Sequence, residues 1–109
     1  MIDIKSFKKL KLKIGTIEKG EEFPQAKKAA YKLKIDFGPY GKKWSSAQIT
    51  ENYNLEELRG RRILAAMNLG PKKIGSFVSE VLVMGSKDEN GHVVLLEPET
   101  DIQNGAKIS

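Results

Sequence analysis

The most regular pattern in the chain is an alternation of apolar and charged residues over positions 31–37. Apolar residues occupy the odd positions of this segment, and Lys32, Lys34 and Asp36 occupy the even ones. A period of two is typical of a half-buried β-strand. Lysines separate the apolar residues over positions 10–14 in the same way. The pattern therefore predicts a strand in each segment and turns Lys32 and Lys34 away from the core.

The alternation changes phase after Ile14. Gly15 and Thr16 intervene before the next apolar residue, Ile17. Because one extra residue turns every following side chain to the opposite face, a change of phase at a glycine predicts a β-bulge and a sharp bend. A long, bent first strand is what a small barrel needs in order to contribute to both of its sides.

The later elements follow from turn and capping residues. Asn54 and Glu57 match the capping box of a short helix that Gly60 ends. Asn90-Gly91 favours a tight hairpin turn. Further strands are expected at positions 42–49, 63–67, 77–84 and 93–96.

The expected order is a short helix capped by Asp3, three strands, a helix, two strands, and then a hairpin. Three strands, a helix and two more strands is the order of a five-stranded Greek-key barrel, the OB-fold. We therefore expect an all-β, five-stranded OB-fold barrel with a short N-terminal helix and a helix between strands 3 and 4. Residues 1–109 are expected to form this single domain. Such barrels bind oligonucleotides on the face of their second and third strands, so Lys32, Lys34 and Gln48 are candidate nucleic-acid contacts.

Composition limits the classes of protein that remain. Hydrophobic residues make up 39% and charged residues 30% of the chain, which is typical of a globular domain. There is no cysteine, so a disulfide framework and a thiolate metal site are excluded, and a reducing cytoplasm fits. No segment is long and apolar enough for a signal sequence or a membrane span, so we expect a cytoplasmic protein without membrane insertion.

Positive charge is concentrated in the first half of the chain. Residues 1–50 hold 12 lysines and 5 acids, a net charge of +7, whereas residues 51–109 hold 7 basic and 9 acidic residues, a net charge of −2. A basic half attracts polyanions such as RNA through long-range, salt-sensitive fields. The alternative is a solvated, lysine-rich face with no ligand.

The sequence does not provide the groups of an active site. The one histidine, His92, follows Asn90-Gly91 and is expected to be a solvated turn residue. Without cysteine or a second histidine, a zinc site would need carboxylates almost alone, which suits that metal poorly. No glycine-rich nucleotide-binding motif occurs. We therefore expect a binding module without cofactor or metal rather than an enzyme.

Positions 68–73 form a candidate basic finger. Asn68 ends an apolar run, Pro71 stiffens the turn, and Lys72 and Lys73 follow it. Two lysines beside the open face of a barrel can neutralise phosphates, while Asn68 offers hydrogen bonds to base edges. The alternative is a solubilising hairpin tip.

Ser79 and Glu80 interrupt an apolar run, and two polar residues at such a position indicate a specific role. Both can hydrogen-bond a splayed nucleotide, and Glu80 can accept a hydrogen bond from an exocyclic amine while repelling phosphate. Trp44 and Tyr53 are candidate stacking platforms, although a lone Trp in a strand of a small barrel is more often part of the core.

These residues carry a resemblance to a known family. From Leu10 to Ile108 the chain resembles the tRNA-binding domain that occurs appended to some aminoacyl-tRNA synthetases and as free-standing small proteins, and within it the CsaA-type export chaperones. The family's finger falls on Asn68, Leu69, Pro71, Lys72 and Lys73, and its Ser-Glu pair falls on Ser79 and Glu80. The resemblance implies an OB-fold, a homodimer and no catalytic activity.

Two departures point to the CsaA-like branch. Ala47, Gln48 and Ile49 stand where tRNA-binding members usually have Ser-Gly-Ile, and Val81-Leu82 stands where they have Gly-Met. Gln48 and Val81 thus replace glycines that give a nucleotide room. The CsaA-like branch is linked to secretion through binding of unfolded precursor polypeptides.

Two functions follow as expectations. The first is a non-enzymatic, CsaA-like secretion chaperone that binds unfolded or precursor polypeptides and carries a tRNA-binding surface. The alternative is a free-standing tRNA-binding protein that acts through the basic finger and the second and third strands. An accessory domain lost from a catalytic partner is a third, weaker interpretation.

A homodimer is also expected from the apolar residues near the two ends of the chain. Ile2, Ile4, Ile102 and Ile108 are available to cover exposed strand edges by pairing with a second copy.

Overall fold

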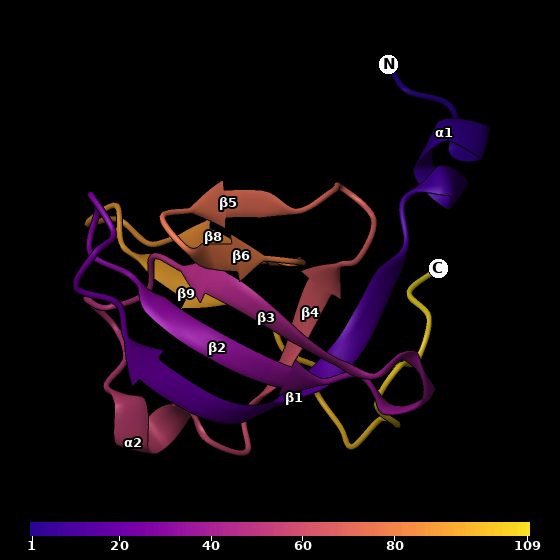
Figure 1. The fold of residues 1–109 in the computed structure, drawn as a ribbon. Coiled ribbons are helices and arrows are strands. Elements are labelled where there is room, and N and C mark those ends of the chain that lie inside the picture. Colours follow the sequence, from indigo (N-terminus) through magenta and orange to yellow (C-terminus); the bar gives the residue numbers. More distant parts are fainter.

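The computed structural model describes residues 1–109 as a curved antiparallel barrel with two small helices. The five-stranded sheet has the order β3-β2-β1-β4-β7, and two hairpins, β5-β6 and β8-β9, complete the barrel (Figure 1). The expected all-β, OB-like fold is confirmed. In chain order the elements are α1 (Ile4–Lys9), β1 (Leu12–Glu22), β2 (Tyr31–Asp36), the 3-10 turn η1 (Gly38–Tyr40), β3 (Lys42–Ala47), α2 (Leu55–Leu58), β4 (Arg62–Ala66), β5 (Lys72–Ile74), β6 (Phe77–Ser79), β7 (Leu82–Val83), β8 (Gly85–Lys87) and β9 (Val93–Leu95).

Strand β1 contributes to both sides of the barrel, as its length predicted. Its first half pairs with β4 and its second half pairs with β2. The register shift lies between Ile17 and Lys19, so the bulge was predicted too early, at Gly15. A glycine is needed at position 15 for another reason, because a Cβ there would lie only 2.6 Å from Cε1 of Phe37. The glycine allows a core aromatic ring to pack directly against the strand.

The segment 77–84 is not one strand, as its apolar pattern predicted, but two. β6 ends at Ser79 and β7 begins at Leu82. Between them the Val81 side chain is buried in the core, and the backbone N–H of Glu80 donates to the carbonyl of Trp44 on β3 at 2.8 Å. The chain therefore turns from one neighbour to another at Glu80, where a continuous strand would have had a single partner.

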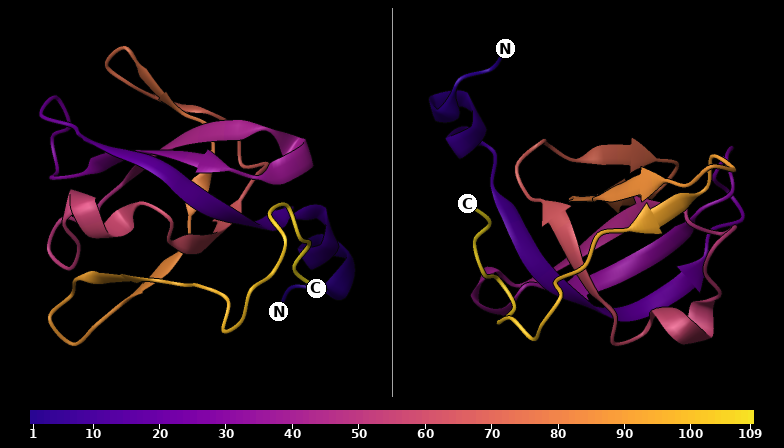
Figure 2. Two further views of the ribbon diagram at one scale, coloured as in Figure 1. Left: turned by 90° about the horizontal axis from the view of Figure 1, so that it is seen from below. Right: turned by 180° about the vertical axis from the view of Figure 1, so that it is seen from behind.

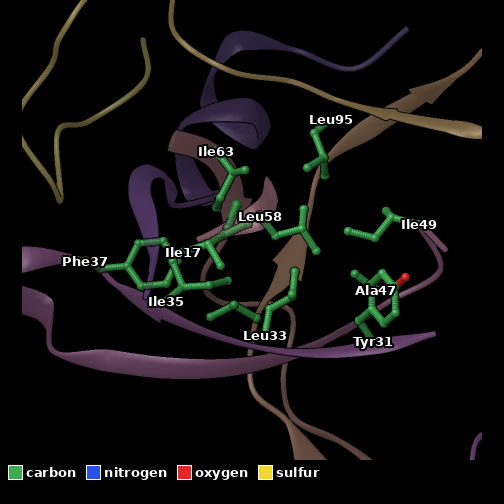
Figure 3. Packing of buried hydrophobic residues seen from close by; sticks show 12 residues of the cluster. Ile17, Tyr31, Leu33, Ile35, Phe37, Ala47, Ile49, Leu58, Ile63 and Leu95 are labelled. Carbon is green, nitrogen blue, oxygen red and sulfur yellow. The ribbon is translucent and has the colours of Figure 1, made fainter. Parts of the chain in front are cut away.

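Twelve buried hydrophobic residues fill the barrel (Figure 3). The inward residues of β2 are all buried, and Leu33 and Ile35 are fully enclosed. Tyr31 is also inward, and its hydroxyl donates to the backbone carbonyl of Tyr53 at 2.9 Å. Complete burial of an aliphatic side chain such as Leu33 or Ile35 stabilises the fold by about 1.5–3 kcal/mol. The alternation over positions 31–37 therefore identified this part of the core correctly.

The two ends of the chain lie on the same side of the barrel (Figures 1 and 2). Asp3 caps α1, as expected, because its Oδ1 accepts from the N–H of Ser6 at 2.8 Å. No residue of α1 is buried. The tail runs beside β1, where the N–H of Ile108 donates to the carbonyl of Leu12 at 3.2 Å. No helix in the structure has the length and apolar character that crossing a membrane requires.

Candidate functional site

The predicted basic finger is the entry to the β5-β6 hairpin. Lys72 and Lys73 are the first residues of β5, and both are exposed. The tip of the hairpin is formed by Gly75 and Ser76, where Gly75 has a φ of +61°. The two lysines are therefore not a hairpin tip. The register places Lys72 directly opposite Ser79, so the finger and the Ser-Glu pair share one small sheet.

Ser79 and Glu80 connect this hairpin to the edge of β3. The N–H of Trp44 donates to Glu80 Oε1 at 2.9 Å, and the N–H of Ser46 donates to Ser79 Oγ at 3.0 Å. One hydrogen bond joins the hairpin to β3 through backbone atoms only, from the N–H of Glu80 to the carbonyl of Trp44. Side-chain oxygens thus take the place of a strand partner, since backbone donors at a strand edge need acceptors.

An aromatic cluster holds the hairpin against the outer side of the barrel. The Phe77 ring packs edge-on against Phe23 at 5.2 Å and against Trp44 at 6.1 Å between centroids. Such pairs contribute about 0.5–1.5 kcal/mol beyond their buried area. Trp44 is thus not part of the core cluster but supports the hairpin. Stacking of Trp44 on a nucleic-acid base stays a prediction.

A cleft of about 550 Å³ opens between the β1-β2 loop and the β5-β6 hairpin. Figure 2 shows this loop and the hairpin tip at the same end of the molecule. None of the cleft's four lysines is in an ion pair, and no acidic residue lines it. We call it the basic cleft; its lining residues are Gln25, Ala26, Lys27, Lys28, Ala30, Ser46, Gln48, Lys72, Lys73, Ile74 and Gly75.

A second cleft of about 400 Å³ adjoins the first. It lies between the end of β3, the hairpin, and strands β7 to β9. Eight of its thirteen lining residues are hydrophobic, and Lys72 is the only charged one. We call it the apolar cleft; its lining residues are Ser46, Ala47, Gln48, Ile49, Lys72, Ile74, Ser79, Leu82, Val83, Met84, Gly85, Val93 and Leu95.

Lys32 and Lys34 lie outside both clefts. Lys32 Nζ lies 3.5 Å from Glu21 and over the rings of Phe23 and Phe77, at 5.6 and 5.8 Å from the centroids. Lys34 Nζ lies 3.9 Å from Glu18. A hydrogen bond from Lys19, aided by Lys32, lowers the pKa of Glu21. The charge of these two β2 lysines is thus partly neutralised within the protein.

Asn68 lies at the start of the finger, and its side-chain amide makes hydrogen bonds within the protein. Its Oδ1 accepts from the N–H of Lys11 at 2.8 Å, and its Nδ2 donates to the carbonyl of Lys9 at 2.8 Å. Both halves of the amide thus fix the junction of α1 and β1. Tyr53 is likewise a support, because its hydroxyl accepts from the N–H of Leu95 at 3.0 Å.

The structure therefore brings together four of the eight predicted site residues: Gln48, Lys72, Lys73 and Ser79. Glu80 follows β6 and lines a different pocket together with Lys32, and Asn68 and Lys34 lie outside both clefts. As ligand contacts, all eight stay predictions. Sequence reasoning missed Lys27 and Lys28, which lie in the loop after β1. Their adjacency in a barrel loop beside the binding face was a signal that could have identified them.

Comparison with known proteins places the chain in a family. The family model described as "Putative tRNA binding domain" matches residues 12–107. The chain therefore belongs to the tRNA-binding domain family.

Within this family, solved structures of chaperones resemble the protein over its whole length. Chaperone CsaA from Bacillus anthracis str. Ames is 50% identical with a TM-score of 0.94, covering 100% of this chain and 99% of that one. The CsaA chaperone protein from Picrophilus torridus is 45% identical with a TM-score of 0.93, covering 100% of both chains. The methionine–tRNA ligase of Methanocaldococcus jannaschii is 33% identical over 98% of this chain, which spans only 16% of the ligase.

Proposed function

We propose that this protein is a non-enzymatic, CsaA-like chaperone that binds unfolded or precursor polypeptides before export, and that it carries an RNA-binding surface. The observation that carries the proposal is the apolar cleft, which opens on the same face as the four unpaired lysines. Exposed apolar area in a cleft is the feature that weak, broad polypeptide binding requires. Whole-chain similarity to two CsaA chaperones supports it. We also propose that the protein acts in the cytoplasm, where a chain without cysteine has no disulfide to lose.

The second candidate is tRNA binding as the main activity. It is favoured by the basic cleft, in which Lys27 and Lys28 face Lys72 and Lys73 across a groove without acids. Lysines in this arrangement neutralise successive phosphates of a polynucleotide.

The two candidates differ in their response to salt. Labelled tRNA should lose affinity steeply as salt rises, and the variant with Lys72→Ala and Lys73→Ala should flatten the log-log slope by about 1.4–1.8, because each phosphate contact contributes about 0.7–0.9. The matched control is Arg59→Ala with Lys87→Ala, whose exposed side chains line neither cleft. An unchanged slope in the first variant would remove the finger from the RNA surface.

The chaperone proposal is tested by aggregation of a chemically denatured model protein after dilution. We expect suppression at near-stoichiometric amounts of this protein, with little dependence on salt. Tight tRNA binding without any suppression would reverse the order of the two candidates.

A further inference from the structure

The apolar and basic clefts lie side by side, and we call the pair the groove. Four residues line both clefts and so form their common border: Ser46, Gln48, Lys72 and Ile74. A ligand longer than either cleft therefore meets an apolar surface at one end and positive charge at the other.

The apolar half of the groove fits a polypeptide better than a nucleic acid. Bases of single-stranded nucleic acid are held mainly by stacking on aromatic side chains. No aromatic ring lines the apolar cleft, whose hydrophobic residues are aliphatic or Met84. Aliphatic walls with a flexible methionine suit aliphatic side chains of varied shape. Leu82, which is 50% exposed, offers such a surface directly to solvent.

The basic half of the groove determines which polypeptides fit. The only charged side chains in the two clefts are Lys27, Lys28, Lys72 and Lys73. None of these four lysines is in an intramolecular ion pair, whereas Lys32 and Lys34 of β2 both are. A carboxylate entering this half gains a partner, whereas a lysine or arginine meets only like charge.

We propose that the groove holds an extended polypeptide segment in which aliphatic residues adjoin acidic ones, and that it discriminates against aliphatic segments flanked by basic residues. The inference rests on the proposed polypeptide-binding function and adds a charge rule to it. Because phosphates and carboxylates use the same lysines, RNA and such a segment bind in competition.

Three labelled octapeptides test the rule by fluorescence anisotropy at low salt. Each has the same run of leucine and valine, flanked by three glutamates, three lysines or three serines. We expect the acidic peptide to bind at least about tenfold more tightly than the basic one, with the serine peptide between them. Unlabelled tRNA should displace the acidic peptide.

Two variants connect the preference to the groove. Lys27→Glu with Lys72→Glu should abolish the difference between the acidic and basic peptides, because the basic half then holds two lysines and two glutamates. Arg59→Glu with Lys87→Glu carries the same change in net charge outside both clefts and should leave the order unchanged. Leu82→Ser, at an exposed position of the apolar half, should weaken all three peptides several-fold without altering their order.

The failures of the two proposals are distinguishable. Equal binding of the three peptides, or a preference for the basic one, overturns the charge rule while the chaperone proposal stands. Absence of binding by every peptide together with absence of aggregation suppression overturns the chaperone proposal itself. Binding of tRNA that Leu82→Ser weakens as much as it weakens peptide would make the apolar half an RNA site and also overturn the inference.

Discussion

Polar side chains at single positions hold distant backbone segments together in this small protein. The Asn68 amide bridges to the backbone before β1, and Glu80 bonds to the backbone of β3. Asp88 does the same within the β8-β9 hairpin, where Oδ1 accepts from the N–H groups of Asn90 and His92 and Oδ2 accepts from Asn52 Nδ2. These residues satisfy backbone donors that the sheets leave without partners.

Asp88 should make the stability of the hairpin depend on pH. The N–H of His92 and then the Asn52 amide lower the pKa of Asp88 below its ordinary value of 3.8. A carboxylate with a lowered folded-state pKa stabilises the fold fully above its unfolded-state value, and this contribution is lost as the pH falls through the folded-state value. Urea unfolding from pH 5 to pH 2 should therefore show a smaller loss of stability for Asp88→Asn than for the parent protein.

The matched control for this measurement is Glu89→Gln, one residue along the same turn, whose carboxylate accepts none of the hydrogen bonds that hold the turn. Its difference from the parent protein should not vary with pH between the same limits. Parallel curves for Asp88→Asn and the parent protein would show that the Asp88 carboxylate does not support the turn.

At the scale of elements, the decisive junction is the one between β3 and β6. The two strands are linked by one backbone hydrogen bond and by side-chain oxygens of Ser79 and Glu80. The hairpin also rests on the Phe77 ring. Because β5 pairs with β6 and places Lys72 opposite Ser79, this junction also holds Lys72 near the end of β3, where both clefts lie.

Glu80→Ala should lower the free energy of unfolding by about 1–3 kcal/mol, because it leaves the partly buried N–H of Trp44 without an acceptor. Glu80→Gln keeps an acceptor at the same place and should lose less. Urea denaturation measures both changes, and Ser76→Ala at the exposed hairpin tip is the control. If Glu80 served only to contact a ligand, both variants would unfold like the parent protein.

The sequence predicted the elements with strong period and capping signals. The alternation around Leu33 and the Asn54–Glu57 capping box both occur in the structure as expected. It was less informative where a tertiary contact decides the local conformation. Gly15 resembles a bulge residue but is required by the Phe37 ring, and the break at Glu80 depends on a strand that lies more than thirty residues earlier in the chain.

The candidate site was predictable only in part for the same reason. Lys72 and Lys73 could be singled out because they follow Pro71 in a recognisable motif. Lys27 and Lys28 have no local signal beyond their adjacency, and only the curvature of β1 brings their loop beside the hairpin (Figure 2). Conversely, the ion pair of Lys32 with Glu21 depends on strand register, which the sequence pattern does not specify.

At the scale of the whole molecule, the two functional clefts and the chain ends occupy different regions. The clefts are lined by residues between positions 25 and 95 of the barrel, whereas α1 projects from it and the tail runs beside β1 (Figure 1). A separate groove of about 410 Å³ lies between α1 and the tail, and half of its ten lining residues are hydrophobic. Ligand binding and self-association can therefore use separate surfaces.

We predict that the protein is a homodimer through α1 and this groove. A helix of six residues is far below the length of about 12–15 residues at which an isolated helix becomes even marginally stable in water, and no residue of α1 is buried within the monomer. Ile2 and Ile4 are 74% and 63% exposed, so a second copy that covers them would supply the missing stabilisation. Sedimentation at micromolar concentration should give twice the chain mass of 12.2 kDa. Ile2→Asp with Ile4→Asp should reduce this to one chain mass, whereas Val78→Asp, on the exposed side of β6, should not. A parent protein that sediments as a single chain would leave α1 without a partner and contradict the prediction.

The same variant tests whether the two subunits of a dimer bind tRNA independently. If each basic cleft acts alone, the Ile2→Asp, Ile4→Asp monomer should bind tRNA with the same affinity per subunit as the dimer. A loss of more than about tenfold in the monomer would mean that one tRNA spans the clefts of both subunits, since linked sites raise the overall affinity without any new contact.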